Sequence, residues 1–157
     1  LAVPRYHQLA RLRRAWMGLL GGALLGSAVA VVVAMVLAAA LGASHATVLS
    51  MAAKSVTMPI ALGLTEKLGG IPSLTSALVM LTGILGGAIT QPVLALMRIG
   101  EPYIAGFTLG TVAHGIGTAR ALQGSIEMGA FAGLAMGLAG LLTAVLVPVG
   151  LQLAGLL

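Results

Sequence analysis

Cysteine and aspartate are both absent from this chain, and its only carboxylate side chains are three glutamates, Glu66, Glu101 and Glu127. The absence of cysteine excludes disulfide bonds and disfavours a zinc site. The three carboxylates are scattered among connectors, and the three histidines lack the spacing of metal ligands. The sequence therefore predicts a protein that is not an enzyme and that uses no metal or cofactor.

Charge of either sign is scarce, at 7% of the residues, whereas 59% are hydrophobic. A soluble domain carries about 25% charged residues. The apolar runs are long and do not alternate with a period of two, so they indicate helices rather than strands of a barrel. At about 20 residues per span, the length allows roughly five or six crossings of a lipid bilayer. We therefore expect residues 1–157 to form a single, all-α membrane domain, a polytopic bundle of transmembrane helices.

The positive charges gather before the first apolar run, at Arg5, Arg11, Arg13 and Arg14. Cations that flank a span stay on the cytoplasmic side, which predicts that residues 1–14 lie there. A nucleic-acid-binding arm is the alternative. The cluster is short and adjoins a span, so we expect no nucleic-acid partner.

Three stretches are typical of regular transmembrane helices: residues 16–42, 72–97 and 127–147. We expect Pro92 to kink or end the second and Pro148 to interrupt the third. Two stripes of glycine at every fourth position predict close helix packing. These stripes are Gly18, Gly22 and Gly26 in the first stretch and Gly129, Gly133 and Gly137 in the third.

Two further stretches are interrupted by polar residues. They contain Lys54-Ser55-Val56-Thr57-Met58-Pro59 and His114-Gly115-Ile116-Gly117-Thr118-Ala119-Arg120. Proline removes a backbone donor, and glycine weakens a helix. Broken helix at membrane depth is tolerated only beside other protein or a water-filled cavity. We therefore expect helix to lapse around residues 55–59 and 114–118, with Pro59, Gly115 and Gly117 as the causes. The alternative is a pair of loops whose cations reach the interface by snorkelling.

A shift of 60 positions places Lys54 on His114 and brings both breaks into register. Paired broken segments in two halves of a chain point to a transporter's substrate site, often within an inverted repeat. We expect the breaks to meet near the bilayer midplane, across a polar cavity. The candidate substrate-binding residues are Lys54, Ser55, Thr57, His114, Gly117, Thr118 and Arg120.

This set suits a small anion, because its cations outnumber any nearby acid. The guanidinium of Arg120 can bind a carboxylate through two hydrogen bonds. Helix N-termini at the breaks would add partial positive charge. His114 could carry a coupled proton.

The two polar motifs resemble the signature stretches of the LrgB/CidB family. Further stretches look like that family in the same order: residues 1–6, 69–75, 82–86 and 127–131. The resemblance covers essentially the whole chain, and it implies that upstream membrane segments are missing. The chain departs from the family pattern at Met58, Gln91 and Gly115, and these departures concern the substrate preference more than the fold.

The resemblance implies a multi-pass protein of the bacterial inner membrane that acts with a small LrgA/CidA-type membrane protein. The family is described as antiholin-like or holin-like and as modulating murein hydrolase activity and autolysis. Plant plastid relatives are glycolate/glycerate translocators, and bacterial members are linked to pyruvate uptake. A carrier for small monocarboxylates, of the pyruvate, glycolate, glycerate and acetate class, is therefore expected. The alternative is a holin-like protein that forms homo-oligomers and has no dedicated substrate site.

Overall fold

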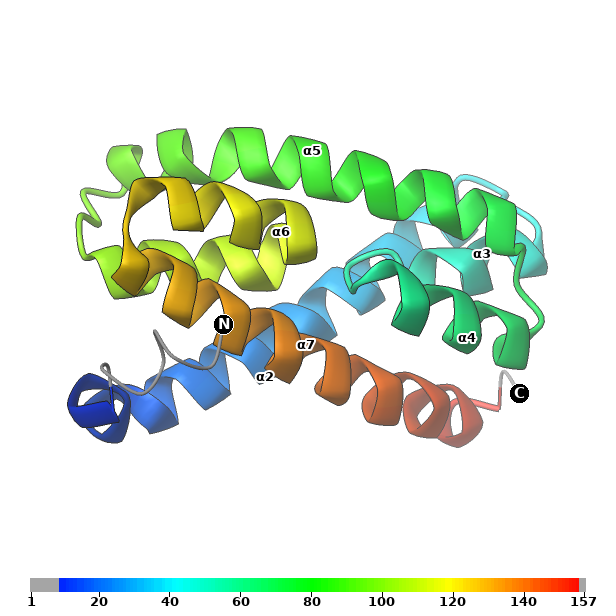
Figure 1. Ribbon diagram of the computed structural model, residues 1–157. Coiled ribbons are helices and arrows are strands. Elements are labelled where there is room, and N and C mark those ends of the chain that lie inside the picture. Colours follow the sequence, from blue (N-terminus) through cyan, green and yellow to red (C-terminus); the bar gives the residue numbers. More distant parts are fainter. Residues whose placement is uncertain (1–8, 156–157) are drawn as a thin grey trace.

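Helices make up nearly all of the described chain, residues 9–155, in the computed structural model (Figure 1). No strand occurs among these residues, so the expected all-α class is confirmed. The arginine-rich segment 1–14 lies mostly outside the described residues. The helices are α2 (Leu9–Ala40), α3 (His45–Ala52), α4 (Met58–Leu68), α5 (Pro72–Leu96), α6 (Pro102–Gly124) and α7 (Ile126–Leu153).

Three of these helices are long and apolar enough to cross a membrane: Arg13–Ala40 within α2, all of α5 and all of α7. The 25 residues of α5 and the 28 of α7 span about 37 and 42 Å. Each length exceeds the ~30 Å hydrocarbon core of a bilayer. The described residues thus hold fewer full-length spans than the five or six that the chain length allows.

Prolines begin helices here more often than they end them. Pro59, Pro72 and Pro102 each lie in the first turn of α4, α5 and α6, where the missing N–H would have no partner inside the helix. Pro148 lies inside α7, which continues to Leu153. The predicted interruption at Pro148 is therefore wrong, because one lost backbone hydrogen bond is tolerated inside a membrane helix. Pro92 likewise lies inside α5, which runs on to Leu96.

The two remaining apolar stretches fold as hairpins rather than as spans. In the first hairpin, α3 leads to a turn at residues 53–57, and α4 returns (Figure 1). In the second, α6 doubles back on itself at His114, whose φ of 41° and ψ of −123° are not helical. A Cβ atom added at Gly117 would collide with the carbonyl oxygen of Leu109. Residues eight positions apart in a straight helix lie about 12 Å apart, so this contact requires the chain to reverse.

The hairpins approach the centre of the molecule from opposite ends. In Figure 1 the turn between α3 and α4 points towards the bend of α6, and both lie along α5. The helices α5 and α7 run in opposite directions, and α2 crosses α7 (Figure 1). The chain therefore alternates long helices with hairpins in the order helix, hairpin, helix, hairpin, helix.

Glycines determine how closely α6 and α7 approach. A Cβ atom at Gly106 or Gly110 would collide with the backbone of Met128 or Ala132, respectively, in α7. In the α2 stripe, a Cβ atom at Gly18 or Gly22 would meet nothing within 4 Å, whereas one at Gly26 would lie 3.7 Å from Cγ2 of Thr111 in α6. Within the described residues, the predicted close packing is therefore absent at the first two of these glycines. In the α7 stripe, Gly129 and Gly133 are buried, whereas Gly137 is exposed.

Candidate functional site at the two helix breaks

The first break occupies residues 53–57, between Ala52 at the end of α3 and Met58 at the start of α4. The predicted lapse around residues 55–59 is confirmed at residues 55–57. It is wrong at Met58 and Pro59, which form the first turn of α4. The sequence correctly marked the interruption, and the proline position decides where the helix resumes.

The polar residues of the first break lie at its tip. The ammonium Nζ of Lys54 donates a hydrogen bond to Oγ of Ser55 at 3.0 Å, and both side chains are half-buried. Thr57 is the N-cap residue of α4, but its side chain makes no capping hydrogen bond. The backbone N–H groups of the first turn of α4, together with Lys54, therefore make this tip electropositive.

The second break is a single residue, His114. Its side chain is 5% exposed, and its Nε2 atom lies 3.1 Å from the carbonyl oxygen of Val79 in α5. Since a carbonyl only accepts, the imidazole donates this bond from Nε2. The hydroxyl of Thr118 donates to the carbonyl oxygen of His114 at 2.8 Å. The bend is thus held on its side chain and on its backbone.

The predicted cause of the second break is partly wrong. Gly115 and Gly117 were expected to break the helix, yet the positive φ belongs to His114 and to neither glycine. The role of Gly117 is to let the two arms of the hairpin touch at Leu109. A positive φ on a residue with a Cβ atom costs roughly 1–3 kcal/mol, so neighbouring contacts must hold it.

Two residues of α5 that contact His114 at the bend were not identified from the sequence. Val79 supplies the carbonyl that His114 binds, and Gly83 lies beneath the ring. A Cβ atom at Gly83 would approach Cε1 of His114 to 2.8 Å and Cδ1 of Ile116 to 2.6 Å. The glycine at position 83, inside the stretch 82–86 that resembles the family, was the feature of the sequence that could have indicated this contact.

Both breaks converge on the central parts of the same two long helices. Val79, which accepts the hydrogen bond from His114, belongs to the apolar cluster that contains Ala53 and Val56 of the first break. On α7, a Cβ atom at Gly140 would meet Cδ1 of Ile60 at 2.8 Å.

One turn earlier on α7, the sulfur of Met136 lies 3.7 Å from the hydroxyl oxygen of Thr118. The residues that follow each break, Ile60 in α4 and Thr118 in α6, thus reach neighbouring turns of α7.

Buried hydroxyls hold the first hairpin against α5. Oγ1 of Thr75 donates to the carbonyl of Ser50 at 3.2 Å and lies 2.9 Å from Oγ1 of Thr65. Oγ of Ser50 accepts from the backbone N–H of Ile71 at 2.7 Å. A Cβ atom at Gly70 would approach Cγ2 of Thr65 to 2.8 Å, so there is no room for a larger residue at this position of the connector between α4 and α5.

The structure brings most of the candidate residues into these two tips, with one exception. Lys54, Ser55 and Thr57 lie in the first break, and His114, Gly117 and Thr118 lie at the second. Arg120 is exposed on the returning arm of α6, one and a half turns beyond the bend.

Two pockets lie elsewhere in the described residues. One has a volume of about 360 Å³ between α2 and α7, and the other, of about 560 Å³, lies between α2 and the first arm of α6. None of the seven candidate residues lines either pocket. The expected cavity between the breaks therefore stays a prediction.

Long apolar helices that alternate with polar-tipped helical hairpins define a helical integral membrane protein. The chain belongs to the LrgB-like family, whose match covers residues 1–153. It is therefore a bacterial membrane protein of the antiholin-like LrgB family.

Similar curated proteins carry the name "Antiholin-like protein LrgB". The protein of Bacillus mycoides is 33% identical over 155 residues, which is 98% of this chain and 67% of that protein. Proteins of Bacillus cereus and Bacillus anthracis are 32% identical over the same shares. No solved structure matches the chain.

Proposed function

We propose that this protein transports small monocarboxylates across the bacterial inner membrane by alternating access. One observation carries the proposal: two hairpins enter from opposite ends, and residues at or next to their breaks pack against the central turns of α5 and α7. Transporters that use broken helices bind their substrates where such tips meet. In this proposal, residues 1–157 are a single membrane domain built on an inverted repeat.

The chemistry of the tips supports an anionic substrate. Each returning arm, α4 and the second half of α6, begins at a break and directs its N-terminal N–H groups towards the other hairpin. Such N-termini bind anions. Lys54 adds a full positive charge, and no Asp or Glu lies in either break.

The proposed roles follow from position. Lys54, Ser55 and Thr57 bind the carboxylate and the neighbouring oxygen of a substrate such as pyruvate, glycolate, glycerate or acetate. His114 and Thr118 form the opposite wall, and Gly117 keeps that wall narrow. Arg120 lies nearer the exposed end of its arm, where its guanidinium would receive a carboxylate as it enters or leaves.

The second candidate function is antiholin-like control of murein hydrolase activity and autolysis, without a substrate site. The name of the relatives, antiholin-like protein LrgB, favours it. In that case, the protein forms homo-oligomers or a complex with a small LrgA/CidA-like membrane protein, and its packing faces carry the function. The polar breaks favour the carrier, because a polar residue at membrane depth usually has a function.

Uptake into proteoliposomes tests the proposal. Purified protein should accumulate labelled pyruvate, glycolate, glycerate or acetate, with and without the LrgA/CidA-like partner, and it should retain a trapped fluorescent dye. Release of the dye at the rate of carboxylate movement would indicate a lesion and would refute the carrier.

A further inference from the structure

The pocket between α2 and α7 differs from the rest of the protein in how its hydroxyl groups are satisfied. Ser27 and Thr143 line it, with side chains that are 7% and 4% exposed. Within the part of the chain that the structure describes, neither hydroxyl has a hydrogen-bond partner. Buried polar groups normally have one, so each exception requires an explanation.

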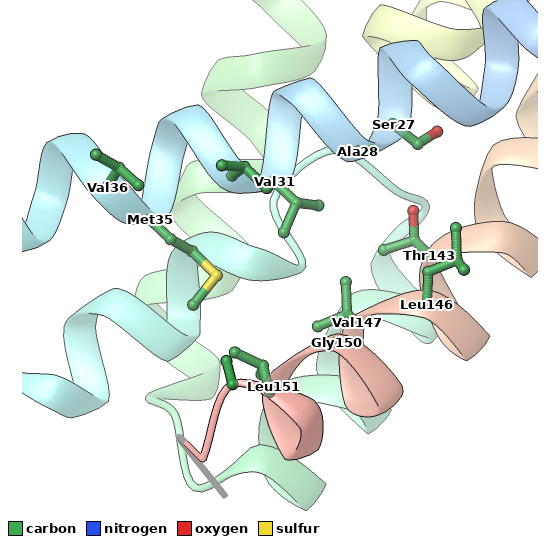
Figure 2. A pocket seen from close by; sticks show the side chains of 12 residues that line it. Ser27, Ala28, Val31, Met35, Val36, Thr143, Leu146, Val147, Gly150 and Leu151 are labelled. Atoms are coloured by element: carbon green, nitrogen blue, oxygen red, sulfur yellow. The ribbon is translucent and has the colours of Figure 1, made fainter.

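Comparison with the other hydroxyls shows that this is unusual here. Six serine or threonine side chains donate to the carbonyl oxygen four residues earlier in their own helix: Ser50, Ser76, Thr90, Thr108, Thr111 and Thr118. Such back-bonding is the usual solution in a membrane helix. Ser27 and Thr143 make no such bond, and both residues line the pocket. Figure 2 shows the oxygen of Thr143 directed from α7 towards α2, on the side where Ser27 lies.

The rest of the pocket is apolar and of a suitable size for a small molecule. Its volume is about 360 Å³, within the range of about 300–1,000 Å³ that is typical of ligand sites. Met35 and Leu151 extend into it from opposite helices (Figure 2). Val32 and Val36 at its rim are more than half exposed, so the pocket opens onto the apolar surface of α2.

The position of the hydroxyls excludes two obvious occupants. Ser27 lies near the middle of Arg13–Ala40, and Thr143 lies near the middle of α7. The ester groups of a phospholipid stay outside the ~30 Å hydrocarbon core and do not reach this depth. No charged residue lines the pocket, so a carboxylate or other ion would lie there unpaired.

We infer that this pocket binds an uncharged, lipophilic carbonyl compound that enters from the lipid. A carbonyl oxygen has two lone pairs and accepts one hydrogen bond from each hydroxyl. The apolar body of the molecule then lies against Val31, Met35, Val147 and Leu151. This site is separate from the two helix breaks and does not depend on the carrier proposal.

Benzophenone is a direct probe, because it is an uncharged diaryl ketone that inserts into nearby C–H bonds when it is irradiated. In proteoliposomes of the protein, labelling should saturate and should map to peptides that contain Met35, Val147 or Leu151. Diphenylmethane has the same two rings without the carbonyl oxygen. It should compete about tenfold more weakly than unlabelled benzophenone, since two hydrogen bonds are lost.

Variants assign the effect to the pocket. Ser27→Ala combined with Thr143→Val should raise the half-saturating concentration about tenfold. Thr90→Val should leave it unchanged, because this hydroxyl is also buried but bonds to Gly86. Gly150→Leu should abolish labelling by filling the pocket, while Gly137→Leu should not. A Cβ atom at either glycine meets nothing within 4 Å, so neither substitution clashes at its first atom.

Three outcomes would overturn the inference. They are labelling that does not saturate, equal competition by diphenylmethane, and equal labelling of the wild type and Gly150→Leu. Each would show that the pocket is only an apolar groove for lipid chains. The competition experiment uses unmodified protein, so it stands even if a variant folds poorly.

Discussion

The imidazole of His114 donates from Nε2 to the carbonyl oxygen of Val79, 35 residues earlier in the chain, at 3.1 Å. This bond joins the bend of the α6 hairpin to α5. Val79 also belongs to the apolar cluster of the first break, so both hairpins are positioned against the same residue of α5. A buried side chain thus links the two features that the sequence presents as separate motifs.

The conformation of His114 can be tested by comparing His114→Gly with His114→Ala. Glycine adopts a φ of 41° without strain, whereas alanine retains the Cβ atom that makes it costly. We expect His114→Ala to have a free energy of unfolding about 1 kcal/mol lower than that of His114→Gly. Thermal unfolding in detergent, followed by circular dichroism, measures this difference, and equal stabilities would show that the bend is unstrained. Both variants should lose carboxylate uptake.

The two glycines of the second motif should respond in opposite ways to alanine. Gly117→Ala forces a Cβ atom onto the Leu109 carbonyl and should destabilise the fold by more than about 2 kcal/mol. Gly115→Ala meets no atom within 4 Å and should be neutral, or stabilising by about 0.5–1 kcal/mol. The melting temperatures of the two variants decide the matter. If they fall by the same amount, the hairpin arms do not touch as described.

Substitution of Arg120 distinguishes a substrate contact from an interfacial anchor. Arg120→Gln should abolish carboxylate uptake, and Arg120→Lys should impair it, because an ammonium group cannot form the two-bonded fork. Membrane insertion should persist, since removing a charge eases insertion. Arg98→Gln is the matched control, because Arg98 is also exposed but lies in the α5–α6 connector. Normal uptake by Arg120→Gln would make Arg120 an anchor only.

The hydroxyl network behind the first hairpin should contribute to stability rather than to specificity. Thr75→Val removes the donor to Ser50 and leaves the buried hydroxyl of Thr65 without that partner. We expect a loss of about 1–3 kcal/mol. Ser73→Ala, on the exposed face of the same helix, should change little. The uptake of correctly folded Thr75→Val should keep the substrate preference of the wild type, and an altered preference would place Thr75 in the substrate path.

Much of the candidate site could be located from local sequence, because breaks in a membrane helix require unusual residues. Pro59 and the polar run before it marked the first break to within two residues. The run from His114 to Arg120 marked the second, although its glycines were given the wrong role. Two glycines of the α2 stripe, Gly18 and Gly22, have no close neighbour among the described residues, because small residues permit close packing but do not supply the partner helix.

Composition by itself determined that this chain is a helical membrane protein, since a sequence with so few charges can satisfy its backbone in lipid only within helices or a closed barrel. Local residue types also determined where the apolar stretches are interrupted. Only the tertiary structure decided that α6 reverses at His114. The reason is physical: the backbone angles of that residue are costly alone and are held by Val79 and Gly83, which lie more than 30 residues away in the chain. It likewise decided that Pro148 leaves α7 intact, and that Ser27 and Thr143 face a shared pocket instead of bonding to their own helices.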